Sequence, residues 1–85
     1  MFAGEEADVV LECDAGLIGV IVDRFGTDVS IHTDGNRFTA YVKVAVSEQF
    51  FGWVAALDGA VRIVSPQAVK EQFLAMLDRV RAAQQ

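Results

Sequence analysis

The chain has 85 residues, of which 53% are hydrophobic, and its 12 acidic and 7 basic residues give a net charge of −5. This length supports one domain with a single modest core. The acidic balance argues against neutralising duplex DNA phosphates or binding an anionic membrane surface. The single cysteine excludes an internal disulfide and is typical of the reducing cytosol. The chain has no apolar run of transmembrane length, so we expect a cytoplasmic protein.

The start of the chain predicts one strand and one helix. Residues 1–7 are expected to be a disordered lead-in, with a single domain over residues 8–85. Alternation of apolar and polar residues predicts a strand over residues 8–13. Asp14 is a suitable N-cap for a helix over residues 15–25, which Gly26 would end. Four apolar side chains of this helix fall on one arc: Leu17, Ile18, Ile21 and Phe25.

A hairpin is expected next. Strands are predicted over residues 27–33 and 37–46, because both segments alternate apolar with polar residues. Between them, Asp34-Gly35-Asn36 is a tight-turn signal. The second strand directs a row of apolar side chains inward: Phe38, Ala40, Val42, Val44 and Val46.

The remaining residues predict a helix, a strand and a second helix. Ser47 is the expected N-cap of a helix that Gly59 ends. The buried stripe of this helix leaves Phe51 at its margin and consists of Phe50, Trp53, Val54 and Leu57. A short strand follows at residues 61–63. In Ser65-Pro66, Ser65 would cap the last helix and Pro66 would occupy its first position. That helix has the cleanest amphipathic stripe: Val69, Phe73, Met76, Leu77 and Val80.

This order of elements is the ferredoxin-like β-α-β-β-α-β pattern, followed by an additional C-terminal helix. We therefore expect an α+β fold with a four-stranded antiparallel sheet. Right-handed crossovers place both connecting helices on one face of such a sheet. The opposite face is the expected working surface, and alternation assigns to it Val10, Glu12, Ser30, His32, Thr39, Tyr41, Lys43, Arg62 and Val64.

The residues offer little catalytic chemistry, so we expect neither an enzyme nor a metal or cofactor. One histidine and one cysteine do not provide metal-ligand spacing. Ser30 and His32 have no third group to orient them as a catalytic triad. Acylphosphatases share this topology, but they need an Arg-bearing anion loop after the first strand. This chain has Asp14-Ala15-Gly16-Leu17 at that place.

The open sheet face is the remaining candidate for binding. Sheets of the RNA-recognition type bind single-stranded nucleic acid through two or three aromatic residues with basic flanks. The corresponding positions here offer Tyr41, while Lys43 and Arg62 could hold one or two phosphates. A solvated or domain-contacting face is the other interpretation of this surface. Phe51, at the margin of its helix stripe, is a candidate contact with another domain.

Five short motifs follow one another along the chain: VVLEC at 9–13, VDRFG at 22–26, VKVAVS at 42–47, FFGWV at 50–54 and VRIVSP at 61–66. In this order they resemble the WCX domain, the C-terminal extension domain of WYL-domain transcriptional regulators. The resemblance covers about residues 8–82. Much of it is core patterning, so its specificity comes from the order of the motifs.

The resemblance implies a non-enzymatic regulatory domain. In such regulators a winged helix-turn-helix binds DNA, a WYL domain senses a ligand, and the WCX domain supports dimerisation and signal transmission. The expected partners are the chain's own WYL and helix-turn-helix domains and a second copy, in a longer regulator of which this chain is one piece. In some members basic WCX residues help to bind a nucleotide or single-stranded nucleic acid, for which Arg62 and then Lys43 are best placed.

A rival interpretation comes from a different class of protein. In this interpretation the chain is a stand-alone small-molecule-binding domain. It would resemble ACT-type modules, which pair through sheet edges or helices and bind an amino acid at their interface. Gly16 and Gly19 keep this alternative open, because a helix surface without side chains allows close approach of a ligand or a second chain.

Overall fold

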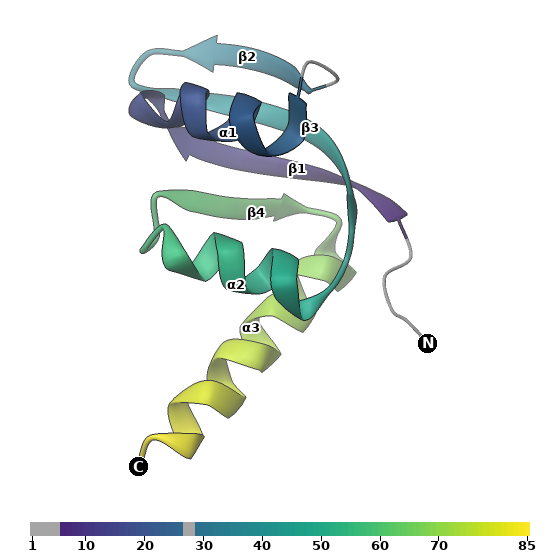
Figure 1. Ribbon diagram of the computed structural model, residues 1–85, viewed down its shortest axis with the longest axis vertical. Helices are drawn as coiled ribbons and strands as arrows, with labels where there is room; N and C mark the ends of the chain where they lie inside the picture. The colour runs from purple at the N-terminus through teal and green to yellow at the C-terminus, as the bar shows by residue number, and fades with distance from the viewer. Residues whose placement is uncertain (1–5, 27–28) are drawn as a thin grey trace.

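The computed structural model describes residues 6–26 and 29–85, which form a four-stranded antiparallel sheet and three α-helices (Figure 1). This is the α+β class expected from the sequence. In chain order the elements are β1 (Glu6–Asp14), the 3-10 turn η1 (Ala15–Leu17), α1 (Ile18–Phe25), β2 (Ser30–Asp34), β3 (Arg37–Ala45), α2 (Glu48–Ala56), β4 (Val61–Ser65) and α3 (Gln67–Ala83).

The sheet has the strand order β2-β3-β1-β4, and every neighbouring pair is antiparallel. The predicted hairpin is confirmed: Asp34 pairs with Arg37, and Gly35-Asn36 forms the two-residue turn between them. Gly35 has a φ of 64°, the left-handed conformation that such turns require. The other two connections are helical: α1 joins β1 to β2, and α2 joins β3 to β4. Each of these connections crosses over one intervening strand.

One face of the sheet, covered by the helices, holds the hydrophobic core (Figure 1). Alternate side chains of each strand point into it, because a half-buried antiparallel strand places apolar residues on one face and polar residues on the other. The predicted inward row of β3 is buried from Phe38 to Val44, and Val46 just beyond the strand is half-buried. The buried set is Val9, Leu11, Cys13, Ile21, Phe38, Ala40, Val42, Val44, Phe50, Phe51, Val54, Val61, Ile63 and Val69.

The last helix, α3, is only partly anchored to this core. Val69 is buried and Phe73 packs against the core, so the first half of the helix is held in place. The second half extends beyond the sheet, and the C-terminus protrudes from the body (Figure 1). Consequently Val80 is 50% exposed, although it belongs to the predicted apolar stripe. Leu74, which lies outside that stripe, is 47% exposed.

The first helix differs from the prediction at its start. The chain turns through η1 before α1 begins, so Asp14 belongs to β1 and makes no side-chain cap. Its backbone N–H instead donates to the carbonyl oxygen of Ala60 at 3.0 Å. Ile18, expected on the buried arc, is 38% exposed. This eight-residue helix meets the sheet over a narrow arc centred on Ile21, and Ile18 lies at the edge of that arc.

The strand ends and the start of α3 also differ from the prediction. β1 begins at Glu6 rather than at residue 8, while residues 1–5 of the expected lead-in lie outside the described residues. β2 begins at Ser30, and residues 27 and 28 of its predicted range are likewise outside them. Ser65 ends β4 by pairing with Val10, so it does not cap α3. Pro66 precedes α3 instead of occupying its first position.

The second helix has the predicted cap but a rotated buried stripe. The backbone N–H of Phe50 donates to Ser47 Oγ at 3.2 Å, which confirms Ser47 as the N-cap. Phe51 is only 5% exposed, whereas Trp53 is half-buried. The reason is α3, whose Phe73 ring lies 5.5 Å from the Phe51 ring. The placement of Phe51 at the margin of the buried stripe, rather than within it, is therefore wrong.

Candidate functional site

The sheet face opposite the helices carries the candidate site, and we call it the open face. Alternation places on it all nine residues that the sequence predicted for the working surface. It also places four charged residues there that sequence reasoning missed: Asp8, Asp14, Asp34 and Arg37. The signal that would have found them is the same period-two alternation. It applies to Asp8 and Arg37 at the first positions of their predicted strands, and to Asp14 and Asp34 one residue beyond the predicted strand ends.

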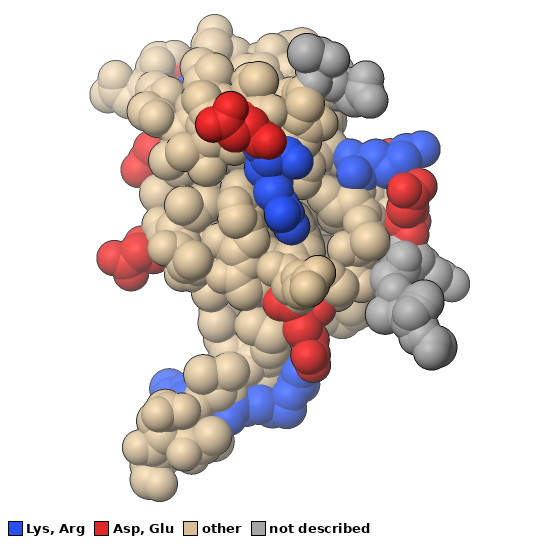
Figure 2. All heavy atoms as spheres, viewed as in Figure 1, with Lys and Arg blue, Asp and Glu red and all other residues tan. Residues whose placement is uncertain are grey.

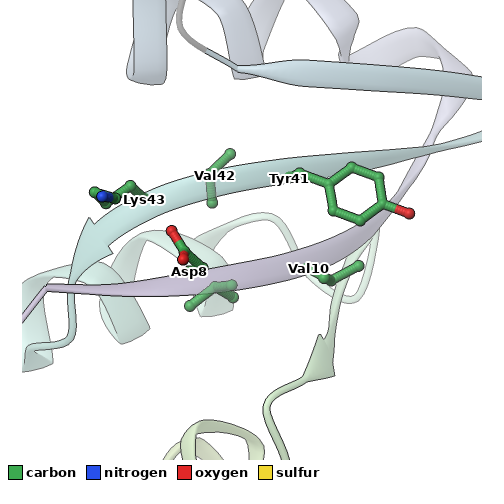
Figure 3. Close-up of a pocket in the computed structure, with 6 residues that line it drawn as sticks. Asp8, Val10, Tyr41, Val42 and Lys43 are labelled. Carbon is green, nitrogen blue, oxygen red and sulfur yellow. The ribbon is translucent and has the colours of Figure 1, made fainter.

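The centre of the open face is apolar. Tyr41 on β3 pairs with Val10 on β1, and Val64 lies on β4. The side chains of Tyr41 and Val64 are 47% and 41% exposed. His32 packs edge-on against Tyr41, with ring centroids 5.4 Å apart. A shallow hollow of about 540 Å³ lies over β1 and β3, and the pairs Val10–Tyr41 and Asp8–Lys43 border it (Figure 3). An exposed aromatic residue on an apolar sheet face favours a contact surface.

Ion pairs border this centre on one side. The Oε1 atom of Glu12 on β1 lies 3.0 Å from a guanidinium nitrogen of Arg62 on β4 and 3.7 Å from one of Arg37 on β3. Arg37 is also 3.9 Å from Asp14 Oδ1. Glu12 therefore links both strands that flank β1. It also neutralises much of the charge that Arg62 would present to a ligand.

On the other side of the centre stand Asp8 and Lys43, which face each other in the β1–β3 register. None of the ion pairs among the described residues includes Lys43. The four-residue offset between Asp8 and Glu12 along β1 places Lys43 and Arg62 about 13 Å apart in the strand direction. These two predicted contact residues share a face but do not converge. A ligand that touches both must cross Val10 and Tyr41.

Phe51, the fourth predicted contact residue, is not on the open face. It lines a groove of about 730 Å³ where the start of α2 meets α3, together with Gln72, Ala75 and Arg79 of α3. A partner could reach Phe51 only by entering this groove. The role of Phe51 as a domain contact remains a prediction, although the ring is buried rather than at the margin of the helix stripe.

The other titratable groups give no sign of a second site. Acidic and basic side chains are interspersed over the face of the body seen in Figure 2, with Lys and Arg also along the far half of α3. Within residues 6–26 and 29–85, no group of three or more His, Cys, Asp and Glu side chains could hold a metal ion. In the same part of the chain, no helix is long and apolar enough to cross a membrane.

These observations define a small α+β domain whose chemistry lies on one open sheet face suited to contacts. Comparison with family models then identifies the family. Residues 5–81 match the model of the WCX domain, so the chain belongs to the WCX domain family, as the order of its motifs indicated. The family suggests a regulatory domain of WYL-type transcriptional regulators. Neither the curated proteins nor the solved structures contain a match to this chain.

Proposed function

We propose that this chain is the C-terminal regulatory domain of a WYL-type helix-turn-helix transcriptional regulator. It acts in the cytoplasm without catalysis, by supporting dimerisation and relaying the ligand state of the regulator. The observation that carries this proposal is the WCX match over residues 5–81. The open face supports it, because an apolar centre with a charged border is the usual anatomy of a protein interface.

A ferredoxin-like topology is part of the proposal. The strand order β2-β3-β1-β4 and two helical connections that each cross one strand support it. In this arrangement β1 and β3 are central, and a signal received at the open face reaches α1 and α2 through one layer of core side chains. The domain is thus built to couple a contact on one face to its helices on the other.

The upstream reading frame tests this function most simply. We expect it to encode a winged helix-turn-helix and a WYL domain in frame before Met1. A stop codon shortly upstream of Met1, with neither domain encoded before it, would contradict the proposal.

The effector is proposed to be a nucleotide or single-stranded nucleic acid that the WYL domain binds with help from the open face. Arg62 on the edge strand β4, at the border of the open face, offers a phosphate contact. Because Arg62 is held by Glu12 and the chain carries a net charge of −5, the domain by itself supplies only part of the affinity.

Removing Arg62 from the full regulator tests the effector proposal. Arg62→Ala should weaken binding of a short single-stranded oligonucleotide about threefold to tenfold, since one phosphate contact is lost. Fluorescence anisotropy at fixed salt measures the affinity. Arg79→Ala, which removes a basic residue on α3 away from the open face, is the matched control. Equal affinities for the two variants would rule out a contact through Arg62.

A further inference from the structure

We propose that the open face is the surface through which two copies of this chain pair. The two-fold axis runs parallel to the strands. It lies above the line along which β1 and β3 pair, which we call the β1–β3 seam. This inference rests on the proposed function, which includes the claim that the domain dimerises. It adds the surface, the symmetry and the residues that meet.

The proposal begins with the register of the two central strands. Opposite Asp8 stands Lys43, opposite Val10 stands Tyr41, and opposite Asp14 stands Arg37. Each of these pairs joins either opposite charges or two apolar groups. Glu12, which lies between these pairs on β1, stands opposite Thr39 and is ion-paired with Arg62 instead. The seam between β1 and β3 thus carries three complementary pairs, and Figure 3 shows two of them lying across it.

A two-fold axis above this seam exchanges the two strands. It sets β1 of one copy over β3 of the partner, so that every residue faces the partner's copy of its own register mate. Asp8 then faces the partner's Lys43, and Val10 faces the partner's Tyr41. Asp14 likewise faces the partner's Arg37. Because the axis repeats each contact, the interface contains four charge pairs around four apolar side chains.

Two other two-fold axes over the same face are disfavoured by charge. An axis parallel to the strands but directly above β1 places Asp8 on the partner's Asp8 and Glu12 on the partner's Glu12. An axis across the strands through Val10 places Asp8 on the partner's Glu12. Like charges brought together across an interface are strongly unfavourable.

The other two boundaries between neighbouring strands offer fewer complementary pairs. The boundary between β1 and β4 offers Glu12 with Arg62, and the one between β2 and β3 offers Asp34 with Arg37. The β1–β3 seam combines two charge pairs with the apolar pair of Val10 and Tyr41, so we place the axis there.

The exposed groups fit this pairing in shape and in charge balance. Two sheets that stack face to face lie about 10 Å apart and interdigitate their side chains. The hollow of about 540 Å³ over β1 and β3 receives the partner's Tyr41. Glu12 and Arg62 remain bonded within each chain, so their charges stay paired when water is excluded. Tyrosine and arginine are also the residues that most often dominate interface energy.

The apolar centre provides the first test. Tyr41→Ser should weaken dimerisation of the chain tenfold or more in sedimentation equilibrium, because it removes two symmetric central contacts. Leu74→Ser is the matched control, since Leu74 on α3 is also 47% exposed but lies off the open face. Thermal unfolding of both variants checks that each is folded. A dimer that survives Tyr41→Ser overturns the proposed interface.

Charge reversal provides the second and sharper test. Asp8→Lys and Lys43→Asp should each weaken self-association, since each variant places like charges across the axis. An equimolar mixture of the two variants should form a heterodimer, with every charge facing its opposite. An ion pair within one chain cannot produce this rescue. In each variant the side chains at positions 8 and 43 of the same chain have the same charge, so only the partner chain can supply the opposite charge. A mixture that associates no better than its components overturns the proposed axis.

The outcomes separate this inference from the proposed function. A wild-type dimer that Leu74→Ser breaks and Tyr41→Ser leaves intact would move the interface to α3 while dimerisation stands. A wild-type chain that stays monomeric at the highest attainable concentration would overturn both the interface and the dimerising role of this domain.

Discussion

At Cys13, the place in the fold decides the chemistry of the side chain. The residue lies in β1 with no exposed surface, among the apolar side chains of the core. Burial, assisted by the carboxylates of Asp14 and Glu12, raises the pKa of its thiol to about 11. A thiol with such a pKa stays protonated at neutral pH, and the thiolate is the reactive form. Cys13 therefore serves as a small core residue.

This pKa predicts a loss of stability in alkaline solution. The folded state holds the thiol proton more tightly than the unfolded chain, so the stabilisation is complete below the ordinary pKa of 9.0 and disappears as the pH rises through about 11. The shift corresponds to about 3 kcal/mol, at about 1.4 kcal/mol per pKa unit. Urea unfolding across this pH range measures it. Cys13→Ala should show a shallower decline, and an equally steep one would contradict the assignment.

At the scale of elements, the serines that precede α2 and α3 have different structural roles. Ser47 lies before α2 and accepts a hydrogen bond from the backbone of Phe50 at 3.2 Å. Ser65 lies before α3 in a similar sequence position but ends β4, and α3 has no side-chain cap. The same residue type therefore has a stabilising role at one helix start and a strand-pairing role at the other.

Replacing the two serines tests this difference. Ser47→Ala should lower the free energy of unfolding by about 1 kcal/mol, because an N–H at the start of α2 loses its acceptor. Ser65→Ala is the control, with an expected change below about 0.5 kcal/mol. Denaturant unfolding of both variants measures the two values. A larger loss for Ser65→Ala than for Ser47→Ala would be inconsistent with these helix starts.

The contact between α2 and α3 explains why α3 belongs to the fold. Phe51 of α2 is 5% exposed and its ring lies 5.5 Å from that of Phe73. Phe51→Ala should therefore cost about 3–5 kcal/mol, as expected for truncating a buried aromatic residue. Hydrogen exchange should also become faster in the first half of α3. Leu74→Ala, on the exposed side of α3, should change stability by less than about 0.5 kcal/mol. Similar losses for both variants would contradict the packing described here.

The types of the helices and strands could be predicted from the sequence, but the burial of some of their side chains could not. Alternation along β3, the Gly35-Asn36 turn and the Ser47 cap depend on neighbours in sequence, and all three are confirmed. The burial of Phe51 depends on α3, which arrives later in the chain and covers one flank of α2. The exposure of Ile18 depends on how narrow the contact of α1 with the sheet is. The hydrophobic periodicity of a single segment therefore predicts neither the burial of Phe51 nor the exposure of Ile18.

For the candidate site, the face on which each residue lies could be predicted from the sequence, but the ion pairs between strands could not. Alternation alone places Tyr41, Lys43 and Arg62 on one face, as the sequence analysis expected. The ion pair that joins Arg62 to Glu12 depends on the register between β1 and β4, which includes an irregularity between Val10 and Leu11. Such a register is a property of the assembled sheet, so no motif in either strand reveals it.

At the scale of the whole molecule, the distribution of charge bears on which domain of the proposed regulator contacts DNA. Ten of the twelve acidic residues precede α3, while α3 itself has three basic and two acidic residues. The body is therefore acidic, and the face of it drawn in Figure 2 presents mixed charges rather than a basic stripe. Duplex DNA binding belongs, in our proposal, to the helix-turn-helix domain of the full regulator. In the same proposal, this domain contributes by bringing two such helix-turn-helix domains together.

Operator binding by the full-length regulator tests this central claim most directly. Two linked helix-turn-helix domains bind a palindromic operator far more tightly than one, because the second contact is intramolecular. Tyr41→Ser in the full regulator should therefore weaken operator affinity about tenfold or more at fixed salt, while Leu74→Ser leaves it unchanged. Equal operator affinities for the wild type and both variants would contradict the account of the open face as the dimerising surface.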